Sequence, residues 1–264
     1  MPARDTFPHS ACASAAAGLP NDLPDAPQHR PPPDPAPAPT VRRNSPATTA
    51  DTGQPRELPT PAFAEAFATA LLDWFAVHKR PLPWRFGYEP YSVWISEVML
   101  QQTQMDRGVD YFLRWMTQFP DAASVAAASE DELLKAWEGL GYYSRVRNLH
   151  KAAKALVERH GGELPDDPEA IRALPGIGPY TAGAIAGIAF NRDVTCIDAN
   201  VERVLSRVFD IDTPVRAQPA AGRIRALAAA LLPAGRARDF NQALMELGAL
   251  VCRKKPQCAS CPLS

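Results

Sequence analysis

From Thr60 onward the sequence repeats apolar residues at intervals of three and four, which is the spacing of helices packed on one face. Thr60 and Pro61 open this region with the residue types of a helix cap and first turn. Strand patterns are nearly absent, because the best one, VTCI before Asp198, is too short to anchor a sheet. The connectors are brief and built from Gly, Pro and Asp, as turns between helices are. We therefore predict an all-α fold whose helices include PAFAEAFATALLDWFAVHK, SVWISEVMLQQTQMDRGVDYFLRWMTQF, SRVRNLHKAAKALVERHG and DFNQALMELGALVC.

Residues 1–58 have a different composition. The chain has 28 prolines, about half of them before Pro61, and this Pro- and Ala-rich region shows no apolar periodicity. Such a segment buries too little apolar surface to offset its chain entropy, so we expect a disordered N-terminal extension. No run approaches the ~18 apolar residues that span a bilayer, and no basic segment precedes an apolar one as in a signal peptide. We expect a cytoplasmic protein without membrane contact.

Net charge constrains how this chain can meet nucleic acid. The formal net charge is -1, which excludes a surface that is basic throughout. Basic residues are concentrated in SRVRNLHKAAK, VERVLSRV and CRKKPQC. Each stretch fits either a solvated helix face or a local contact with phosphates. Any nucleic-acid contact must therefore be local.

The segment LPGIGPYTAGAI, residues 174–185, has the pattern of two helices joined by a Pro-Gly-x-Gly turn. Gly176 and Gly178 carry no side chain and can adopt positive φ, so backbone N–H groups of this turn can approach a phosphate at a helix N-terminus. The pattern fits a helix-hairpin-helix that grips the nucleic-acid backbone. It also fits an ordinary tight turn between two helices.

Two carboxyl groups occupy contrasting sequence environments. Asp198 stands where an apolar run meets a new helix, so the positive end of that helix favours its ionised form; a plain helix cap explains the same pattern. Glu97 lies among Val93, Trp94, Ile95, Val98 and Leu100, where burial raises a carboxyl pKa; an exposed helix face is the alternative. A protonated acid beside an ionised carboxylate is the pair that cleaves a glycosidic bond.

An enzyme that cleaves the bond between a base and its sugar in duplex DNA must flip the nucleotide out of the stack and fill the gap. Gln101, Gln102 and Thr103 follow Glu97 by about one helical turn. Leu140 and Tyr142 lie in the turn GLGYYSR, which is equally consistent with a helix end followed by core aromatics. We predict that these two segments contact DNA.

Taken together, SEVMLQQTQ, GLGYYSRVRNLHKAA, LPGIGPYTAGAI, IDANVERVLSR and NQALMELGALVC resemble the helix-hairpin-helix DNA glycosylases, and among them the MutY adenine glycosylases. The resemblance spans roughly residues 61–264. It implies a two-lobed helical fold with DNA across the cleft: a six-helix lobe at about 85–195, containing the hairpin at 172–190, and a second lobe from 59–84 and 196–251. It also implies excision of adenine mispaired with 8-oxoguanine or guanine in duplex DNA.

The resemblance also implies roles for single residues. Glu97 matches the general acid that protonates adenine, and Asp198 matches the carboxylate that stabilises the oxocarbenium ion. Tyr180 and Asn200 match residues that support this pair. Other matches are Arg85 and Trp84 for the adenine pocket, and Gln102 and Tyr142 for the wedges in the duplex.

Tyr180 distinguishes this chain from its nearest relatives. Endonuclease III-like enzymes have a lysine at the matching position, whose amine forms a Schiff base with the sugar. A phenol cannot form that imine, so we expect a monofunctional hydrolase. We also expect a monomer that is associated with the bacterial nucleoid. The alternatives are a bifunctional glycosylase with lyase activity and a catalytically impaired DNA-binding fragment.

The last residues, VCRKKPQCASCPLS, depart from the family. The resemblance implies a [4Fe-4S] cluster held by the pattern C-x6-C-x2-C-x5-C. Cys252, Cys258 and Cys261 supply three thiols with one residue fewer between the first two, and the fourth ligand is missing. We expect residues 252–264 to be a partial cluster loop in a truncated chain that also lacks the family's C-terminal Nudix-like domain.

Overall fold

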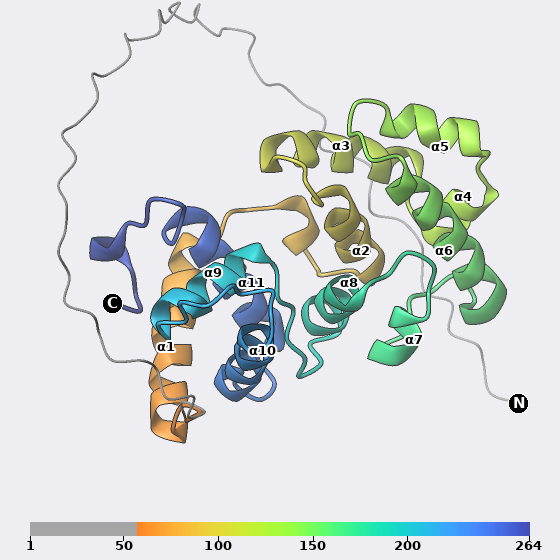
Figure 1. The fold of residues 1–264 in the computed structure, drawn as a ribbon. Helices are drawn as coiled ribbons and strands as arrows, with labels where there is room; N and C mark the ends of the chain where they lie inside the picture. The colour runs from red at the N-terminus through yellow and green to blue at the C-terminus, as the bar shows by residue number, and fades with distance from the viewer. Residues whose placement is uncertain (1–56) are drawn as a thin grey trace, which may run out of the picture. The chain divides into compact units, whose positions relative to one another are not determined.

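The computed structural model describes residues 57–264, and nearly all of the extension predicted at 1–58 lies outside them (Figure 1). The described chain is helical throughout and contains no strand, so the all-α prediction is confirmed and VTCI is not a strand. The α-helices are α1 (Pro61–His78), α2 (Pro90–Met99), α3 (Met105–Gln118), α4 (Ala122–Ala127), α5 (Glu130–Trp137), α6 (Ser144–His160), α7 (Pro168–Arg172), α8 (Pro179–Ala184), α9 (Ala199–Val208), α10 (Ala220–Leu231) and α11 (Ala237–Leu250). Three short helices of other types complete the fold of the described chain. The segments η1 (Pro83–Arg85) and η3 (Cys258–Ser260) are 3-10 helices, and η2 (Ile185–Ala189) continues α8 as a π-helix.

Local capping explains where several helices begin and end. The Thr60 hydroxyl accepts the N–H of Phe63 at 3.3 Å, as expected from the sequence. Ser129 and Glu132 form a reciprocal capping box at the start of α5. Gly161 ends α6 in the left-handed conformation. These boundaries follow from residues within one turn of each helix end.

The expected helix through residues 92–119 is in fact two helices. α2 ends at Met99 and α3 begins at Met105, and between them Gln102 adopts a left-handed conformation with φ 58°. Leu100 packs against the bare backbone of Gly108, where an added Cβ would lie 2.6 Å from Leu100 Cδ2. The break is therefore a packed turn, which helical periodicity alone does not indicate.

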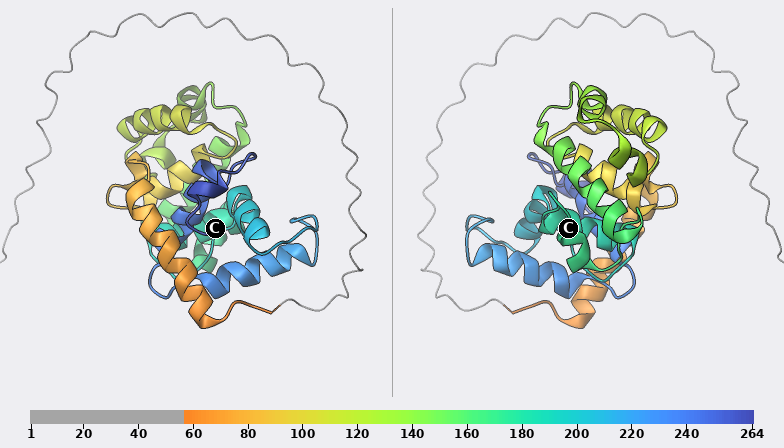
Figure 2. Two further views of the ribbon diagram at one scale, coloured as in Figure 1. Left: turned by 90° about the vertical axis from the view of Figure 1, so that its left-hand side faces the viewer. Right: turned by 90° about the vertical axis from the view of Figure 1, so that its right-hand side faces the viewer.

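Two large hydrophobic clusters form most of the core of residues 57–264, and a smaller third one, around Val93, Ile188 and Cys196, packs against Tyr180 and Met245. The first is built by α2 to α8 and centres on Trp94, Trp115 and Trp137, which are almost fully buried. The second is built by α1, α9, α10 and α11 around Phe75 and Phe240. Figure 2 shows α1 and α10 meeting at one end of this second group. No helix among the described residues is long and apolar enough to cross a membrane.

Helix α11 joins the two clusters, because it packs against both η2 and α9. Arg238 donates to the carbonyls of Ile188 and Ala189 at 2.6 Å each and so closes the end of η2. At the other end of α11, Gly248 allows α9 to approach, since an added Cβ would lie 2.6 Å from Asn200 Cβ. This close packing fixes the segment between η2 and α9, which carries Asp198.

Candidate active site

A cavity of about 640 Å³ opens where the two clusters meet, a size suited to a small ligand such as a nucleobase. Its polar lining comes from segments far apart in the sequence. Of the predicted site residues it contains Trp84, Arg85, Glu97, Gln101, Gln102, Thr103, Tyr180, Asp198 and Asn200. The predicted catalytic and base-pocket residues are thus all brought to one cavity.

Glu97 lies on α2 and faces this cavity. Burial raises the pKa of its carboxyl to about 7, and the nearby carboxylate of Asp198 adds to the rise. Hydrogen bonding from Tyr180, whose hydroxyl donates to Glu97 Oε2 at 2.8 Å, and the positive charge of Arg85 lower the pKa by less than burial raises it. The raised pKa expected from the apolar neighbours of Glu97 is therefore confirmed, and the group holds a proton near neutral pH.

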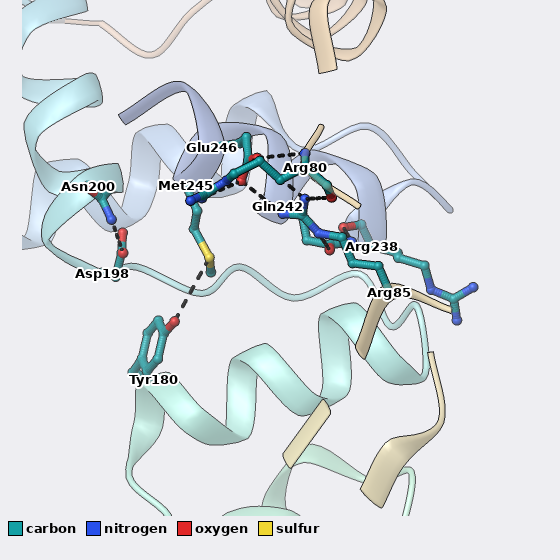
Figure 3. A network of polar contacts seen from close by, with 9 residues as sticks. All are labelled: Arg80, Arg85, Tyr180, Asp198, Asn200, Arg238, Gln242, Met245 and Glu246. Carbon is teal, nitrogen blue, oxygen red and sulfur yellow. Dashed lines mark hydrogen bonds and ion pairs between the residues drawn. The ribbon is translucent and has the colours of Figure 1, made fainter. Parts of the chain in front are cut away.

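Tyr180 stands at the start of α8, within the hairpin. Burial, followed by the charge of Glu97, raises the pKa of its hydroxyl well above the usual value, so the hydroxyl stays protonated as a donor. Its oxygen also lies 4.0 Å from the sulfur of Met245 on α11 (Figure 3). Tyr180 thus spans the cavity between α2 and α11.

Asp198 is the N-cap of α9. Its Oδ1 accepts the N–H of Val201 at 2.8 Å, and its Oδ2 accepts the side-chain amide of Asn200 at 2.7 Å (Figure 3). Arg203 donates to the other side of the Asn200 amide at 2.7 Å and to the carbonyl of Gly248 at 2.8 Å. Because each carboxylate oxygen has its own donor, the orientation of Asp198 toward the cavity is fixed.

Arg85 lies in the cavity wall, but it is also part of an ion-pair network that the sequence did not indicate. Its guanidinium donates to Glu246 at 3.0 Å and to the side-chain oxygen of Gln242 at 2.9 Å. Arg80 donates to Glu246 Oε1 at 2.8 Å (Figure 3). Trp84 is 7% exposed and packs edge-on against Phe112, so it supports the wall.

Glu246 is the most important residue that sequence analysis missed. Burial alone raises the pKa of its carboxyl, but hydrogen bonds and charge from Arg80 and Arg85 outweigh burial and bring the pKa to about 2. A glutamate within the apolar run ALMELGAL is a local signal that matches the one at Glu97. The two arginines that stabilise its ionised form, however, lie over 150 residues away along the chain.

We expect Glu246→Gln to destabilise the fold by about 3 kcal/mol at pH 7, because it leaves two partly buried arginines without their anion. Urea unfolding measures this loss. As a control, Glu130→Gln removes an exposed ion pair with Arg147 and should change stability by less than about 0.5 kcal/mol.

The pH dependence provides a second check on Glu246. A carboxyl whose pKa falls from 4.5 to about 2 on folding stabilises the protein above pH 4.5, and this stabilisation is lost as the pH falls toward 2. The stability difference between wild type and Glu246→Gln should therefore shrink over that interval. An equal difference at pH 3 and pH 7 contradicts the assignment.

Helices α7 and α8 and the turn between them have the predicted helix-hairpin-helix arrangement, with one difference. Gly176 adopts φ 75°, and an added Cβ would lie 2.4 Å from the side chain of Asn148 on α6. Both the backbone conformation and the close packing against α6 therefore favour glycine at this position. Gly178 instead has φ -86° and ψ 175° and caps α8, which any residue can do. Of the two glycines that can adopt positive φ, Gly176 does so and Gly178 does not.

The predicted DNA-contacting residues fall into exposed and buried groups. Gln102 is exposed, and Tyr142 is 60% exposed with φ 48°. Gln101 and Thr103 are half-buried, and the Gln101 amide lies 3.5 Å from the Thr181 hydroxyl. Leu140, by contrast, is 7% exposed within the first cluster, where it packs as a core residue. Leu140 is therefore not presented to a ligand in this structure.

The three C-terminal cysteines do not form a metal site here. Among residues 57–264, no group of three His, Cys, Asp or Glu side chains is arranged to hold a metal ion. Arg207 instead donates to the carbonyl of Arg253 at 2.7 Å and lies 3.4 Å from the Cys252 sulfur. The residues present therefore do not fit the [4Fe-4S] cluster that the resemblance implies.

Sequence comparisons find adenine DNA glycosylases among the similar proteins. The chain is 45% identical over 208 residues to the adenine DNA glycosylase of Mus musculus, covering 75% of this chain and 40% of that protein. It is 40% identical over 198 residues to the adenine DNA glycosylase of Mycobacterium tuberculosis (strain CDC 1551 / Oshkosh), covering 74% of this chain and 65% of that protein. The chain thus spans about half the length of these relatives.

The fold is shared with solved glycosylase structures. A thermostable thymine-DNA glycosylase matches 76% of this chain and 93% of its own with a TM-score of 0.69 and 27% identity. Endonuclease III, in a trapped covalent intermediate with DNA, matches 78% of this chain and 94% of its own with a TM-score of 0.65 and 23% identity. The family described as HhH-GPD superfamily base excision DNA repair protein matches residues 95–233, more than half of the chain. The chain therefore belongs to the HhH-GPD superfamily of base excision DNA repair proteins.

Proposed function

We propose that this protein is a DNA glycosylase that hydrolyses the N-glycosidic bond of adenine mispaired with 8-oxoguanine or guanine in duplex DNA. The observation that carries the proposal is the pair of carboxyl groups in one cavity: Glu97 with a pKa near 7, and Asp198 held by two donors. Similarity to adenine DNA glycosylases supports adenine as the base. We also propose that the protein acts in the cytoplasm at a bacterial nucleoid, where a chromosomal DNA substrate would lie.

In the proposed mechanism, protonated Glu97 transfers its proton to the adenine ring. The bond between the sugar C1′ and the base nitrogen then breaks, and its electron pair leaves with adenine. The carboxylate of Asp198 stabilises the positive charge that develops on the sugar. Water adds to C1′ and gives a proton to the Glu97 carboxylate, which restores the acid and leaves an abasic site.

The network of Arg80, Arg85 and Glu246 is suited to recognition of the flipped base. Arg80 and Arg85 line one wall of the cavity, and the almost fully buried Glu246 carboxylate accepts from both and holds their guanidinium groups in place. The ring nitrogens on a polar edge of adenine can accept hydrogen bonds from such guanidinium groups. We propose that this wall selects the base, while Glu97 and Asp198 act on the bond.

Tyr180 supports hydrolysis without strand cleavage, because a tyrosine side chain has no amine that can form an imine with the sugar. Its hydroxyl instead donates to Glu97. We expect borohydride to trap no covalent adduct on a duplex containing adenine opposite 8-oxoguanine. Endonuclease III on its own substrate is the positive control for trapping. An efficient adduct with this protein would favour the bifunctional alternative.

The second alternative is a DNA-binding fragment without activity. Single-turnover measurement of adenine release, with protein in excess over the duplex, separates it from the glycosylase. We expect release from the mispaired duplex and none from a duplex with adenine opposite thymine. Retained binding with no release by folded protein would favour the fragment.

A further inference from the structure

Arg145 connects two turns that sequence analysis treated separately. It lies in the first turn of α6, is 9% exposed, and uses both terminal nitrogens of its guanidinium as donors. One nitrogen donates to three carbonyls at the end of α2 and beyond, and the other to two carbonyls after α5. The acceptors are Val98 (2.9 Å), Met99 (3.0 Å) and Gln101 (2.6 Å), then Leu140 (3.1 Å) and Gly141 (3.2 Å).

The two turns are alike in one uncommon respect. Residues 100–104, the first turn, contain Gln102 with φ 58°, and residues 139–143, the second turn, contain Tyr142 with φ 48°. Side chains other than glycine rarely adopt this left-handed conformation, which costs about 1 kcal/mol or more unless the surroundings hold it. Both side chains are exposed. The contacts of Arg145 lie directly beside both strained positions.

The surroundings of Arg145 favour a planar cation. Among residues 57–264, no carboxylate forms an ion pair with it. Its charge is balanced instead by carbonyl oxygens, including those at the negative end of α2. The guanidinium also lies over the rings of Trp137 at 5.2 Å and Tyr142 at 5.7 Å. A lysine ammonium has three donors on one atom and cannot reproduce this fork.

We propose that Arg145 is a positioning residue that holds the first and second turns as one rigid clamp, so that Gln102 and Tyr142 enter the duplex together. This inference rests on the proposed function, because a clamp on the duplex is needed where a base must leave the stack. The first turn follows α2 directly, and α2 carries Glu97. Arg145 thereby also ties the clamp to the helix that presents the acid.

The first test compares Arg145→Lys with wild type in the rate of base flipping. The probe is 2-aminopurine fluorescence in a duplex, next to adenine opposite 8-oxoguanine. We expect flipping to slow by about tenfold or more, since loss of a stacked, oriented contact has effects of that order. Arg147→Lys on the same helix, which keeps an exposed pair with Glu130, should flip the base at the wild-type rate.

Two further measurements separate positioning from a general loss of stability. A substrate with the adenine in an unpaired loop needs little flipping, so Arg145→Lys should release adenine from it at nearly the wild-type rate. In a double-mutant cycle with Tyr142→Ser, the activation free energy of base flipping should rise by less in the double variant than the sum of the rises in the two single variants. The proposal is overturned if Arg145→Lys lowers the adenine release rate equally on both substrates. It is also overturned if the effects of the two substitutions on flipping are additive.

The outcome remains decisive if Arg145→Lys does not fold. In wild-type protein, hydrogen exchange on binding the mispaired duplex should protect amides of both turns together, and protection of one turn alone contradicts a clamp. If wild-type protein flips the base without releasing adenine, and Arg145→Lys flips it about tenfold more slowly, the proposed glycosylase activity is contradicted and the clamp is supported. Release by wild type with unchanged flipping in Arg145→Lys contradicts the clamp alone.

Discussion

Glu97→Gln is expected to lower the single-turnover rate of adenine release by about 10³-fold or more, because general acid catalysis is lost. Duplex binding should stay within a few-fold of wild type, because glutamine keeps the shape of the side chain. The amide still accepts a hydrogen bond from Tyr180, so the cavity keeps its geometry. Release is measured with protein in excess, and binding by fluorescence anisotropy. A fully active variant contradicts the mechanism.

The pH profile of wild-type protein tests the same group. The acid must be protonated, and burial raises the pKa of Glu97 to about 7. The release rate should therefore be level below pH 7 and fall about tenfold per pH unit well above it, down to any path that does not use Glu97. Residual release by Glu97→Gln should show no such fall between pH 6 and pH 9.

Stability provides the control for folding of this variant. The pKa of the Glu97 carboxyl rises from 4.5 to about 7 on folding. This rise does not change the free energy of unfolding below pH 4.5, where the group is protonated in both states. Above pH 7 it lowers the free energy of unfolding by its full amount, because the carboxylate is more stable in the unfolded chain. Glu97→Gln removes the penalty and should stabilise the protein by about 2 kcal/mol at pH 8. Thermal unfolding at pH 8 and pH 4.5 should show the gain at pH 8. A Tm lowered at pH 8 contradicts the buried, protonated acid.

Asp198→Asn is expected to lower adenine release by about 10²-fold to 10³-fold, because an amide cannot balance the positive charge that develops on the sugar. The change separates the charge from the cap. Asparagine caps helices as well as aspartate does, so α9 should begin at the same residue. The amide has one acceptor oxygen and loses the hydrogen bond from Asn200, so the free energy of unfolding should fall by about 1 kcal/mol.

A matched control for Asp198 is available at α4. Asp121 caps that helix by accepting the N–H of Ser124 at 2.7 Å, in an exposed position outside the cavity. Asp121→Asn should leave adenine release unchanged. If both variants lose activity equally, the effect comes from helix capping, and Asp198 has no electrostatic role.

Much of the fold was predictable from short stretches of sequence. Helical periodicity, the cap at Thr60 and the glycine after α6 act within one or two turns of chain, so local pattern is sufficient to place them. The raised pKa of Glu97 was predictable for the same reason, because its apolar neighbours are adjacent on α2. The packed turn at Gln102 was not, since it depends on Leu100 contacting Gly108.

The sequence by itself determined the helices and the two carboxyl groups with contrasting surroundings, because both arise from neighbours along the chain. Tertiary structure alone decided that Arg80 and Arg85 ionise Glu246, and that Leu140 lies in the core while Tyr142 lies at the surface. It also decided that Arg145 joins two turns more than 30 residues apart. The physical reason is that ion pairs, burial and carbonyl contacts depend on distances in space, which periodicity along the chain does not specify.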